Sequence, residues 1–325
     1  MADLHPFLLA PEFHERIWGT RDLRPIYTRI VGDNPIGEAW LTGEKCKVAS
    51  GPLKGETLET LCKRFGAALT GNKAKPADRF PLLAKFLFPH EKLSVQVHPD
   101  DARAQAIGQP WGKTECWYVA SAEPGAQVML GFKAGVTKQE FEQAIHEKRA
   151  EHLLNAVPVQ TGDMIYVDAG TVHAICPGAV IIETQQNSDT TYRLYDYGRP
   201  RELHVEAGLA STKEKTHAGK VKVSRNGNHD VLIASPSFCV ERYSLKSPLK
   251  MSAEERGASV QVLVSEKGTG VLHHAGIEPI AFTPGEAVVV PAECDEFEVQ
   301  PQWECELLRM NLPAHAVPEP TTTLL

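Results

Sequence analysis

The chain has 325 residues, a formal net charge of −7 and a pI of about 6.0. This acidic balance excludes the broad basic surface of a nucleic-acid binder, so an anionic small molecule would have to be held by a local cluster of Lys and Arg. The hydrophobic fraction of 42% is ample for a buried core, and the length suggests about two domains.

The ends of the chain and its cysteines predict a cytoplasmic protein. The apolar piece at residues 7–10 is too short for a signal peptide, and no stretch approaches the roughly 18 apolar residues that span a bilayer. The seven cysteines are scattered and never form a CxxC pair, so neither a disulfide framework nor a Cys-rich zinc site is expected. We therefore expect no membrane contact and no nucleic-acid partner.

Short strands dominate the predicted elements in chain order. A helical pattern at 58–69 is followed by a strand at 93–98, a helix at 100–107, and strands at 115–120 and 126–132. A helical pattern at 138–154 then precedes strands at 164–167, 180–184, 260–264 and 287–290. Most of the strands are bounded by Gly, Pro or Asp. Many short strands with such turns predict an antiparallel sandwich or barrel.

Two stretches of the chain share one design. Residues 162–168 and 285–291 each contain a Gly, five residues rich in strand formers and a turn residue. Residues 117–126 match residues 261–270 more loosely. The sequence separation of this second pair exceeds that of the first pair by about the length of the helical segment near 134–155. The two halves therefore look like copies of one β-unit, with a helix inserted into the first.

The first copy has the spacing of a known metal-binding motif. Gly162, Asp168, Gly170 and His173 resemble the second motif of the cupin barrel, with Asp in place of Pro. In the second copy, Gly and Pro persist, but Glu293 and Glu296 stand where Gly and His would fall. The resemblance implies two cupin-like antiparallel β-barrels of the jelly-roll type, with short helical insertions and a single metal site.

Three further residues can join His173 around a metal ion. Gln96 and His98 are two apart in a strand, so they share one face, and Glu115 lies in the next predicted strand. Each residue alone is an ordinary polar strand residue, but together they favour a site. Two imidazoles and a carboxylate with an open position suit a catalytic Zn²⁺, although Fe²⁺ or Mn²⁺ could bind the same ligands.

Longer motifs connect the chain to a family. The segments KFLFPHEKLSVQVHPDD, GKTECWYV and GTVHAICPGAVIIETQQNSDTTYRLYDYGR resemble type I mannose-6-phosphate isomerases of the short bacterial form, as do RIWGT and IGEAWLTGEKC near the N-terminus. The resemblance is strong over residues 10–210 and weak over 225–312. Longer relatives contain a larger helical domain that this chain lacks.

The resemblance implies a sugar-phosphate substrate and one Zn²⁺ per chain. The enzyme would interconvert mannose 6-phosphate and fructose 6-phosphate through an enediol(ate). The family's metal ligands fall on Gln96, His98, Glu115 and His173, and its active-site arginine on Arg193. We accordingly expect residues 1–215 to form the metal-binding catalytic unit, 216–312 a unit without metal ligands, and 313–325 a flexible tail.

Polar residues near these ligands are candidates for the chemistry. Lys113 lies two residues before Glu115 on the same strand face and could act as a base or proton relay. Glu183 could shuttle protons or bind sugar hydroxyls, and Asp189, in the turn before Arg193, is a further catalytic candidate. Arg193 could stabilise the enediolate or grip the phosphate, and Lys85 is a second phosphate candidate.

Two other functions fit the same pattern. An Fe²⁺-dependent cupin dioxygenase would use a similar ligand set, and a non-catalytic sugar-binding cupin would keep the barrel and metal without the surrounding polar group. The oligomeric state is open, with a monomer as the default. His273 and His274 in the second unit are interpreted as surface residues.

Overall fold

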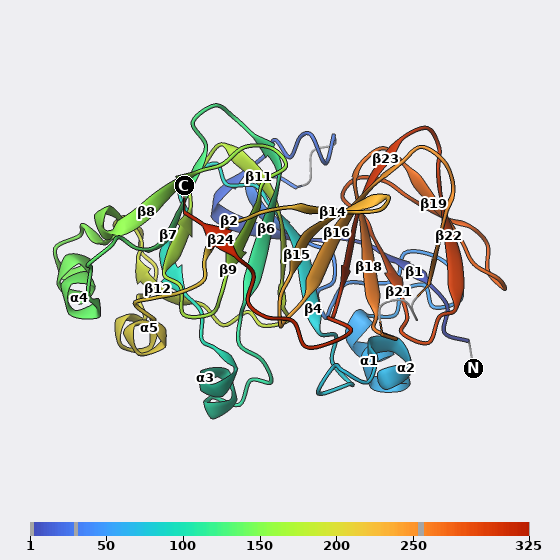
Figure 1. The fold of residues 1–325 in the computed structure, drawn as a ribbon, viewed down its shortest axis with the longest axis horizontal. Coiled ribbons are helices and arrows are strands. Elements are labelled where there is room, and N and C mark those ends of the chain that lie inside the picture. Colours follow the sequence, from blue (N-terminus) through green and yellow to red (C-terminus); the bar gives the residue numbers. More distant parts are fainter. Residues whose placement is uncertain (1–2, 29–31, 253–256, 325) are drawn as a thin grey trace.

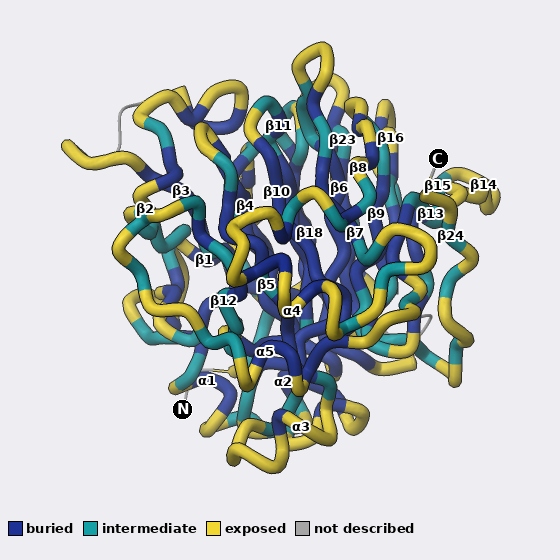
Figure 2. The backbone as a smooth tube through the Cα atoms, turned by 90° about the vertical axis from the view of Figure 1, so that its left-hand side faces the viewer, coloured by how far each residue is buried: buried dark blue, intermediate teal, exposed yellow. Residues whose placement is uncertain are grey.

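A computed structural model describes residues 3–28, 32–252 and 257–324 as a mainly β protein built from antiparallel sheets (Figure 1). The mainly β fold class predicted from the sequence is thereby confirmed. Figure 2 shows the buried strands filling the middle of the molecule, with exposed loops around them. Among the described residues, no helix combines the length and the apolar character that crossing a bilayer requires. All seven cysteines are free.

The first half of the chain forms most of two facing sheets. The larger has eight strands, in the order β2 (Glu12–Thr20), β3 (Ile36–Trp40), β4 (Leu82–Leu87), β11 (Ala179–Gln186), β6 (Glu115–Ala122), β9 (Met164–Val167), β13 (Gly219–Val221) and β24 (Thr322–Thr323). The smaller has five strands, in the order β12 (Tyr192–Tyr195), β5 (Val95–Val97), β10 (His173–Ile175), β7 (Gln127–Phe132) and β8 (Leu154–Pro158).

The second half repeats this arrangement. Its larger sheet has seven strands, in the order β1 (Phe7–Leu9), β21 (Ala287–Val290), β18 (Gln261–Lys267), β23 (Cys305–Asn311), β16 (Cys239–Leu245), β15 (His229–Ala234) and β14 (Ser224–Asn226). Its smaller sheet contains β17 (Leu249–Ser252), β22 (Glu296–Pro301), β19 (Gly270–His273) and β20 (Ile280–Phe282). The order β15-β16-β23-β18-β21 matches β3-β4-β11-β6-β9, strand for strand.

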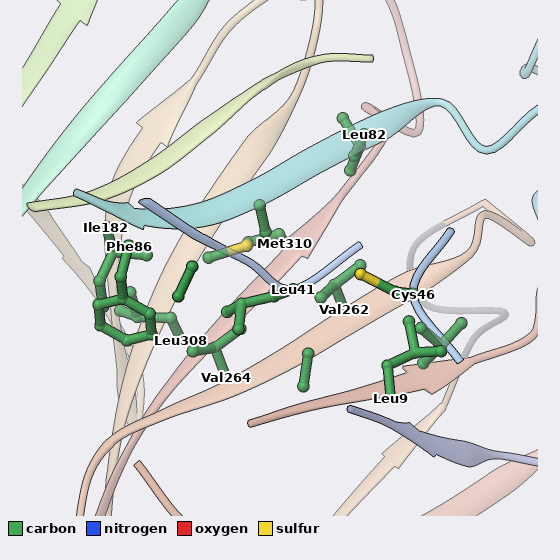
Figure 3. Close-up of a cluster of buried hydrophobic side chains, with 14 of the residues drawn as sticks. Leu9, Leu41, Cys46, Leu82, Phe86, Ile182, Val262, Val264, Leu308 and Met310 are labelled. Atoms are coloured by element: carbon green, nitrogen blue, oxygen red, sulfur yellow. The ribbon is translucent and has the colours of Figure 1, made fainter. Parts of the chain in front are cut away.

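The two halves pack through their larger sheets. Side chains alternate along each strand, so Trp117 and Val119 of β6 face the five-stranded sheet while Cys116 and Tyr118 face the second half. Figure 3 shows the resulting core, in which Phe86 and Ile182 lie near Leu308 of the opposite large sheet. The second half therefore covers the outer face of the large sheet of the first half. A site in the first half would lie on the other face, between its two sheets.

The helices are short and lie at the edges of the sheets. They are α1 (Leu58–Phe65), α2 (Ala67–Thr70), α3 (Asp101–Ala106), α4 (Lys138–His146), the 3₁₀ turn η1 (Ala150–Leu153) and α5 (Val205–Ser211). The helix predicted at 58–69 is interrupted at Gly66, whose φ is 50°. The helix predicted at 138–154 ends at His146, since the chain is recruited into β8 from Leu154 onward.

The structure contains the insertion that the sequence repeat predicts. Helix α4 lies between β7 and β8, whereas only a loop joins the corresponding strands β19 and β20. Phe141 and Ile145 of α4 pack with Val95 and Val97 on the outer face of the five-stranded sheet. The repeated glycines Gly162 and Gly285 both take positive φ, 92° and 89°, in the turns before β9 and β21.

Strand pairing crosses between the halves at both ends of the chain. Strand β1 pairs with β21 of the second half, and β24 pairs with β13 of the first (Figure 1). Tyr166 also donates a hydrogen bond of 2.6 Å to Glu319. Part of the segment expected to be a flexible tail is thus held by a strand pair and a side-chain contact. The domain division at residues 215 and 312 stays a prediction.

Candidate metal centre and active site

Strand β5 directs two of the predicted ligands inward. Val95 and Val97 pack outward against the helices, so Gln96 and His98 point between the two sheets of the first half. This is the alternation that the sequence predicted. Gln96 opposes His173 of β10, and its amide Nε2 lies 3.3 Å from His173 Nε2.

The two histidines and Glu115 converge on one point. Glu115 Oε2 lies 3.5 Å from His98 Nε2, and Glu115 Oε1 lies 3.4 Å from His173 Nε2. One donor atom from each of the three residues lies within 4.8 Å of the others, and all three side chains are buried. The imidazole centroids of His98 and His173 are 4.9 Å apart. The structure therefore brings the predicted ligands together.

Backbone carbonyls fix both imidazoles for metal binding. His98 Nδ1 lies 3.0 Å from the carbonyl of Thr190, and His173 Nδ1 lies 2.9 Å from that of Thr171. With Nδ1–H donating to a carbonyl, each Nε2 presents its lone pair to Glu115 and the shared centre. Burial, helped by the positive charge of Lys113, lowers the pKa of His98 well below its usual value.

Burial likewise lowers the pKa of His173 to about 4. Both rings are therefore neutral at physiological pH, which is the form that binds a metal. Two aligned imidazoles and a buried carboxylate are a donor set that fits a divalent cation. Within the described residues, this is the cluster of His, Cys and acidic groups whose geometry could hold a metal ion.

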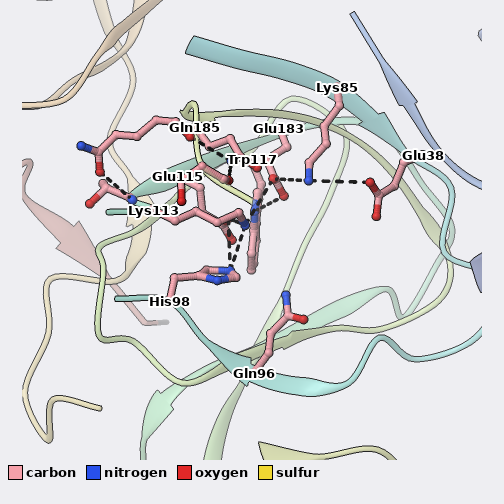
Figure 4. Close-up of polar contacts among 12 residues, drawn as sticks. Glu38, Lys85, Gln96, His98, Lys113, Glu115, Trp117, Glu183 and Gln185 are labelled. Carbon is pink, nitrogen blue, oxygen red and sulfur yellow. Dashed lines mark hydrogen bonds and ion pairs between the residues drawn. The ribbon is translucent and has the colours of Figure 1, made fainter. Parts of the chain in front are cut away.

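Lys113 contacts the centre directly (Figure 4). Its ammonium lies 2.9 Å from His98 Nε2 and 2.5 Å from Glu115 Oε2, and it is 3.8 Å from Glu183 Oε1. Lys113 is only 3% exposed. The amine of Lys113 thus lies within hydrogen-bond distance of two of the candidate ligands.

Charged side chains of alternating sign cross the inner face of the large sheet from its edge towards this centre. We call Arg16, Glu38, Lys85 and Glu183, on the neighbouring strands β2, β3, β4 and β11, the charge ladder. Arg16 donates to both carboxylate oxygens of Glu38, at 3.0 and 3.1 Å. Lys85 Nζ lies 3.9 Å from Glu38 and 3.1 Å from Glu183. Figure 4 draws Lys85 between these two carboxylates.

The charge ladder determines which of its groups are ionised. Burial alone would lower the pKa of Lys85, but the carboxylates of Glu183 and Glu38 outweigh burial and raise it. Burial raises the pKa of Glu183, and the negative charge of Glu115 adds to that effect. Glu183 also accepts a hydrogen bond of 3.1 Å from the indole of Trp117. Lys85 therefore stays protonated, whereas Glu183 is tuned towards proton uptake.

Arg193 and Asp189 reach the same space from the other sheet. Arg193 on β12 opposes Gln96, so their side chains share the inward face. Its Nη1 donates to the carbonyl of Glu202 at 2.7 Å, while its Nε is buried without a hydrogen-bond partner among the described residues. Asp189 precedes Thr190, whose carbonyl holds His98.

A cavity of about 390 Å³ joins these groups. Six of the residues singled out from the sequence line it, namely Lys85, Gln96, Lys113, Glu183, Asp189 and Arg193. Six polar or aromatic lining residues had no role assigned from the sequence: Arg16, Trp18, Glu38, Ser94, Thr191 and Arg201. Three of these six, Arg16, Trp18 and Glu38, lie in the RIWGT and IGEAWLTGEKC motifs, so these motifs could have pointed to them.

Among the described residues, no histidine of the second half belongs to a cluster that could hold a metal ion. Glu293 and Glu296 are exposed, and Glu296 pairs with Lys250 on the outside of β22. The inward positions of that strand are taken by the apolar Phe297 and Val299. His274, expected at the surface, is half-buried, with its ring centroid 5.5 Å from that of His5.

Comparisons with known proteins converge on one family. The profile described as the catalytic domain of type I phosphomannose isomerase matches residues 7–120. A probable mannose-6-phosphate isomerase of Bacillus subtilis is 34% identical over 312 residues, which are 91% of this chain and 96% of that protein. Mannose-6-phosphate isomerase of Streptococcus mutans is 36% identical over 299 residues, 88% of this chain and 92% of the relative.

Solved structures agree in fold. The crystal structure of mannose 6-phosphate isomerase from Bacillus subtilis superimposes with a TM-score of 0.84 at 31% identity, covering 94% of this chain and 99% of the other. A putative mannosephosphate isomerase from Archaeoglobus fulgidus, at 21% identity and a TM-score of 0.74, shares the fold over 95% of this chain and 98% of its own.

Proposed function

Because the chain belongs to the type I phosphomannose isomerase family, we propose that it interconverts mannose 6-phosphate and fructose 6-phosphate in the cavity beside His98. The observation that supports this most directly is the convergence of His98, Glu115 and His173 with Lys113 and Glu183 at one buried place. Isomerisation moves a proton between two adjacent carbons and develops charge on oxygen, so it needs a proton carrier and positive charge together.

The metal would be a single Zn²⁺ held by Gln96, His98, Glu115 and His173. Bound there, it would supply polarisation of the substrate carbonyl and hydroxyl oxygens. The orientation of both imidazoles by backbone carbonyls supports this assignment, since a preset ring geometry is what outer hydrogen bonds give to metal-binding histidines.

Lys113 and Glu183 are our candidates for the proton transfer. They form an ion pair of 3.8 Å and both line the cavity, so either group could reach the same substrate. The raised pKa of Glu183 brings its affinity for a proton closer to that of a general base working near neutral pH. Asp189 would accept hydrogen bonds from sugar hydroxyls at the cavity wall.

Arg193 and Lys85 would supply positive charge. Arg193 has a guanidinium with unused donors facing the cavity and is assigned to the enediolate or the phosphate. Lys85 stays a candidate for the phosphate, but Glu38 and Glu183 already share its ammonium. We therefore propose that its larger contribution is to hold Glu183 in place.

A coupled assay tests the function. Purified protein with measured metal content should convert mannose 6-phosphate to fructose 6-phosphate and catalyse the reverse reaction. Absence of turnover in metal-loaded protein would refute the proposal. Oxygen uptake with sugar substrates would indicate a dioxygenase instead, and sugar-phosphate binding without turnover would indicate a binding module.

A further inference from the structure

Three arginines gather in the segment from β12 onward, beside the cavity. They are Arg193, Arg199 and Arg201, in a chain whose overall charge is −7. Two hydrogen bonds join the ends of this segment. The backbone N–H of Arg193 donates to His204 Nδ1 at 3.2 Å, and the backbone N–H of His204 donates to the carbonyl of Arg193 at 2.7 Å. This closure brings Arg201 back beside Arg193, and both line the cavity.

One buried carboxylate fixes two of these arginines. Asp196 is 2% exposed and accepts hydrogen bonds from Arg199 and Arg201. The turn between them uses left-handed backbone at Tyr197 and Gly198, with φ of 54° and 82°. Asp196 supplies one negative charge against the three positive charges of the arginines, so these four side chains together carry a net positive charge.

The two arginines held by Asp196 differ in what remains free. Arg201 uses Nε and Nη2, each 2.7 Å from a carboxylate oxygen of Asp196, and its Nη1 has no hydrogen-bond partner among the described residues. Arg199 donates to Asp196 and to the carbonyl of Lys92 at 2.8 Å, and its remaining nitrogen faces Glu91 at 3.7 Å. Arg199 does not line the cavity.

We propose that Arg201, together with Arg193, binds the phosphate group of the substrate at the arginine end of the cavity. The inference rests on the proposed function, which supplies a substrate with a dianionic phosphate. A guanidinium immobilised by a buried carboxylate loses little side-chain entropy on binding an anion, and its free N–H groups match phosphate oxygens. Arg201 is thereby a specificity residue for phosphorylated over unphosphorylated sugar.

The test compares Arg201→Ala with the matched control Arg199→Ala. Both variants remove one partner of Asp196, but only the first removes a group that lines the cavity. We expect Arg201→Ala to raise KM for mannose 6-phosphate by at least tenfold with kcat changed less than threefold. Inhibition by inorganic phosphate should weaken by a similar factor, and Arg199→Ala should keep both constants within twofold of wild type.

Binding of inorganic phosphate, measured by calorimetry on metal-loaded protein, separates this inference from the proposed function. An unchanged KM and unchanged phosphate inhibition in Arg201→Ala would overturn the assignment while leaving the isomerase activity intact. Wild-type protein without isomerase activity would refute the function, and loss of phosphate binding in Arg201→Ala alone would still support the anion site. If Arg201→Ala does not fold, Arg201→Gln, which keeps most of the side-chain volume, takes its place with the same expected results.

Discussion

Glu115 and Gln261 occupy the same position in the two halves of the molecule. Each is the first residue of a strand, β6 or β18, and each opposes the last residue of a neighbouring antiparallel strand, Val167 of β9 or Val290 of β21. Each also opposes an amide side chain on its other neighbour, Gln185 or Asn311. The candidate metal carboxylate of the first half is therefore replaced by a neutral amide in the second.

Gln261 is fully buried, and neither atom of its amide has a hydrogen-bond partner among the described residues. A buried polar group without a partner costs about 1–3 kcal/mol. We therefore expect Gln261→Leu to raise the free energy of unfolding by about 1 kcal/mol in urea titrations. The exposed Gln300→Leu is the control and should change it little. Destabilisation by Gln261→Leu would show that the amide has a partner, such as an internal water.

Metal removal should abolish activity and lower stability. A chelator should remove the ion held by His98, Glu115 and His173, and Zn²⁺ should restore turnover. A ligand present at about 100 times its dissociation constant stabilises a protein by about 3 kcal/mol, so the melting temperature should fall with the activity. Glu115→Gln should reproduce both effects without chelator. Full activity in protein shown to be free of metal would contradict the site.

Arg193→Ala should lower kcat/KM by about 100-fold or more while the metal content stays at one per chain, because a charge-assisted contact with the anionic substrate is lost. Arg193→Lys keeps the charge but not the planar donor pair, and should recover part of the loss. Steady-state kinetics with metal analysis of the same samples makes the test. Near-normal turnover of the metal-loaded Ala variant would remove Arg193 from the mechanism.

Lys113→Met and Glu183→Gln should each lower kcat by about 100-fold or more. Both remove a group that can hold the transferred proton, and Glu183→Gln keeps the shape of the side chain. Exchange of the C2 hydrogen of the substrate with deuterated solvent, followed by NMR, distinguishes the two. The variant that loses exchange together with turnover identifies the base; retention of exchange in both variants would exclude the pair.

Because of Glu38, the folding stability of the protein should depend on pH in the acidic range. Burial alone would raise the pKa of Glu38, but Lys85 and Arg16, with hydrogen bonds from Trp40 and Arg16, lower it to about 2 from 4.5. A depressed carboxyl pKa stabilises the fold above the unfolded value, and this contribution is lost as the pH falls from 4.5 towards 2.

We expect Glu38→Gln to cost about 3 kcal/mol of unfolding free energy at pH 7, which is the size of that pKa shift. The difference in unfolding free energy between Glu38→Gln and wild type, measured in urea titrations, should become smaller as the pH falls below 4.5. The exposed Glu142→Gln is the control and should show neither the cost nor the narrowing. If this difference in unfolding free energy stays constant down to the lowest pH at which wild type is folded, the carboxylate of Glu38 does not stabilise the fold in this way.

The ligand pair of β5 could be predicted because it depends only on local geometry. Strand alternation places Gln96 and His98 on one face, and the same logic aligned Lys113 with Glu115. The walls of the cavity could not be predicted in this way. Arg16, Glu38 and Arg201 come from strands or loops far apart in sequence, and a single charged residue in a strand has no local pattern that reveals its cross-strand partner.

The fold class and the repeat followed from short strands and glycine turns, whereas element ends and edge pairing did not. Leu154 has an apolar position compatible with continuing helix α4, but it is recruited into β8, a tertiary interaction that propensity does not record. The pairing of residues 7–9 with β21 depends on two segments at opposite ends of the chain.

The exchanged end strands have a consequence for dividing the gene. A cut after residue 215 would separate β1 from β21 and β13 from β9, so each product would expose an unpaired sheet edge. Neither fragment would be a faithful copy of half the enzyme, and both would be prone to self-association. The two fragments should assemble only when they are produced together, because each supplies the edge strand that the other lacks.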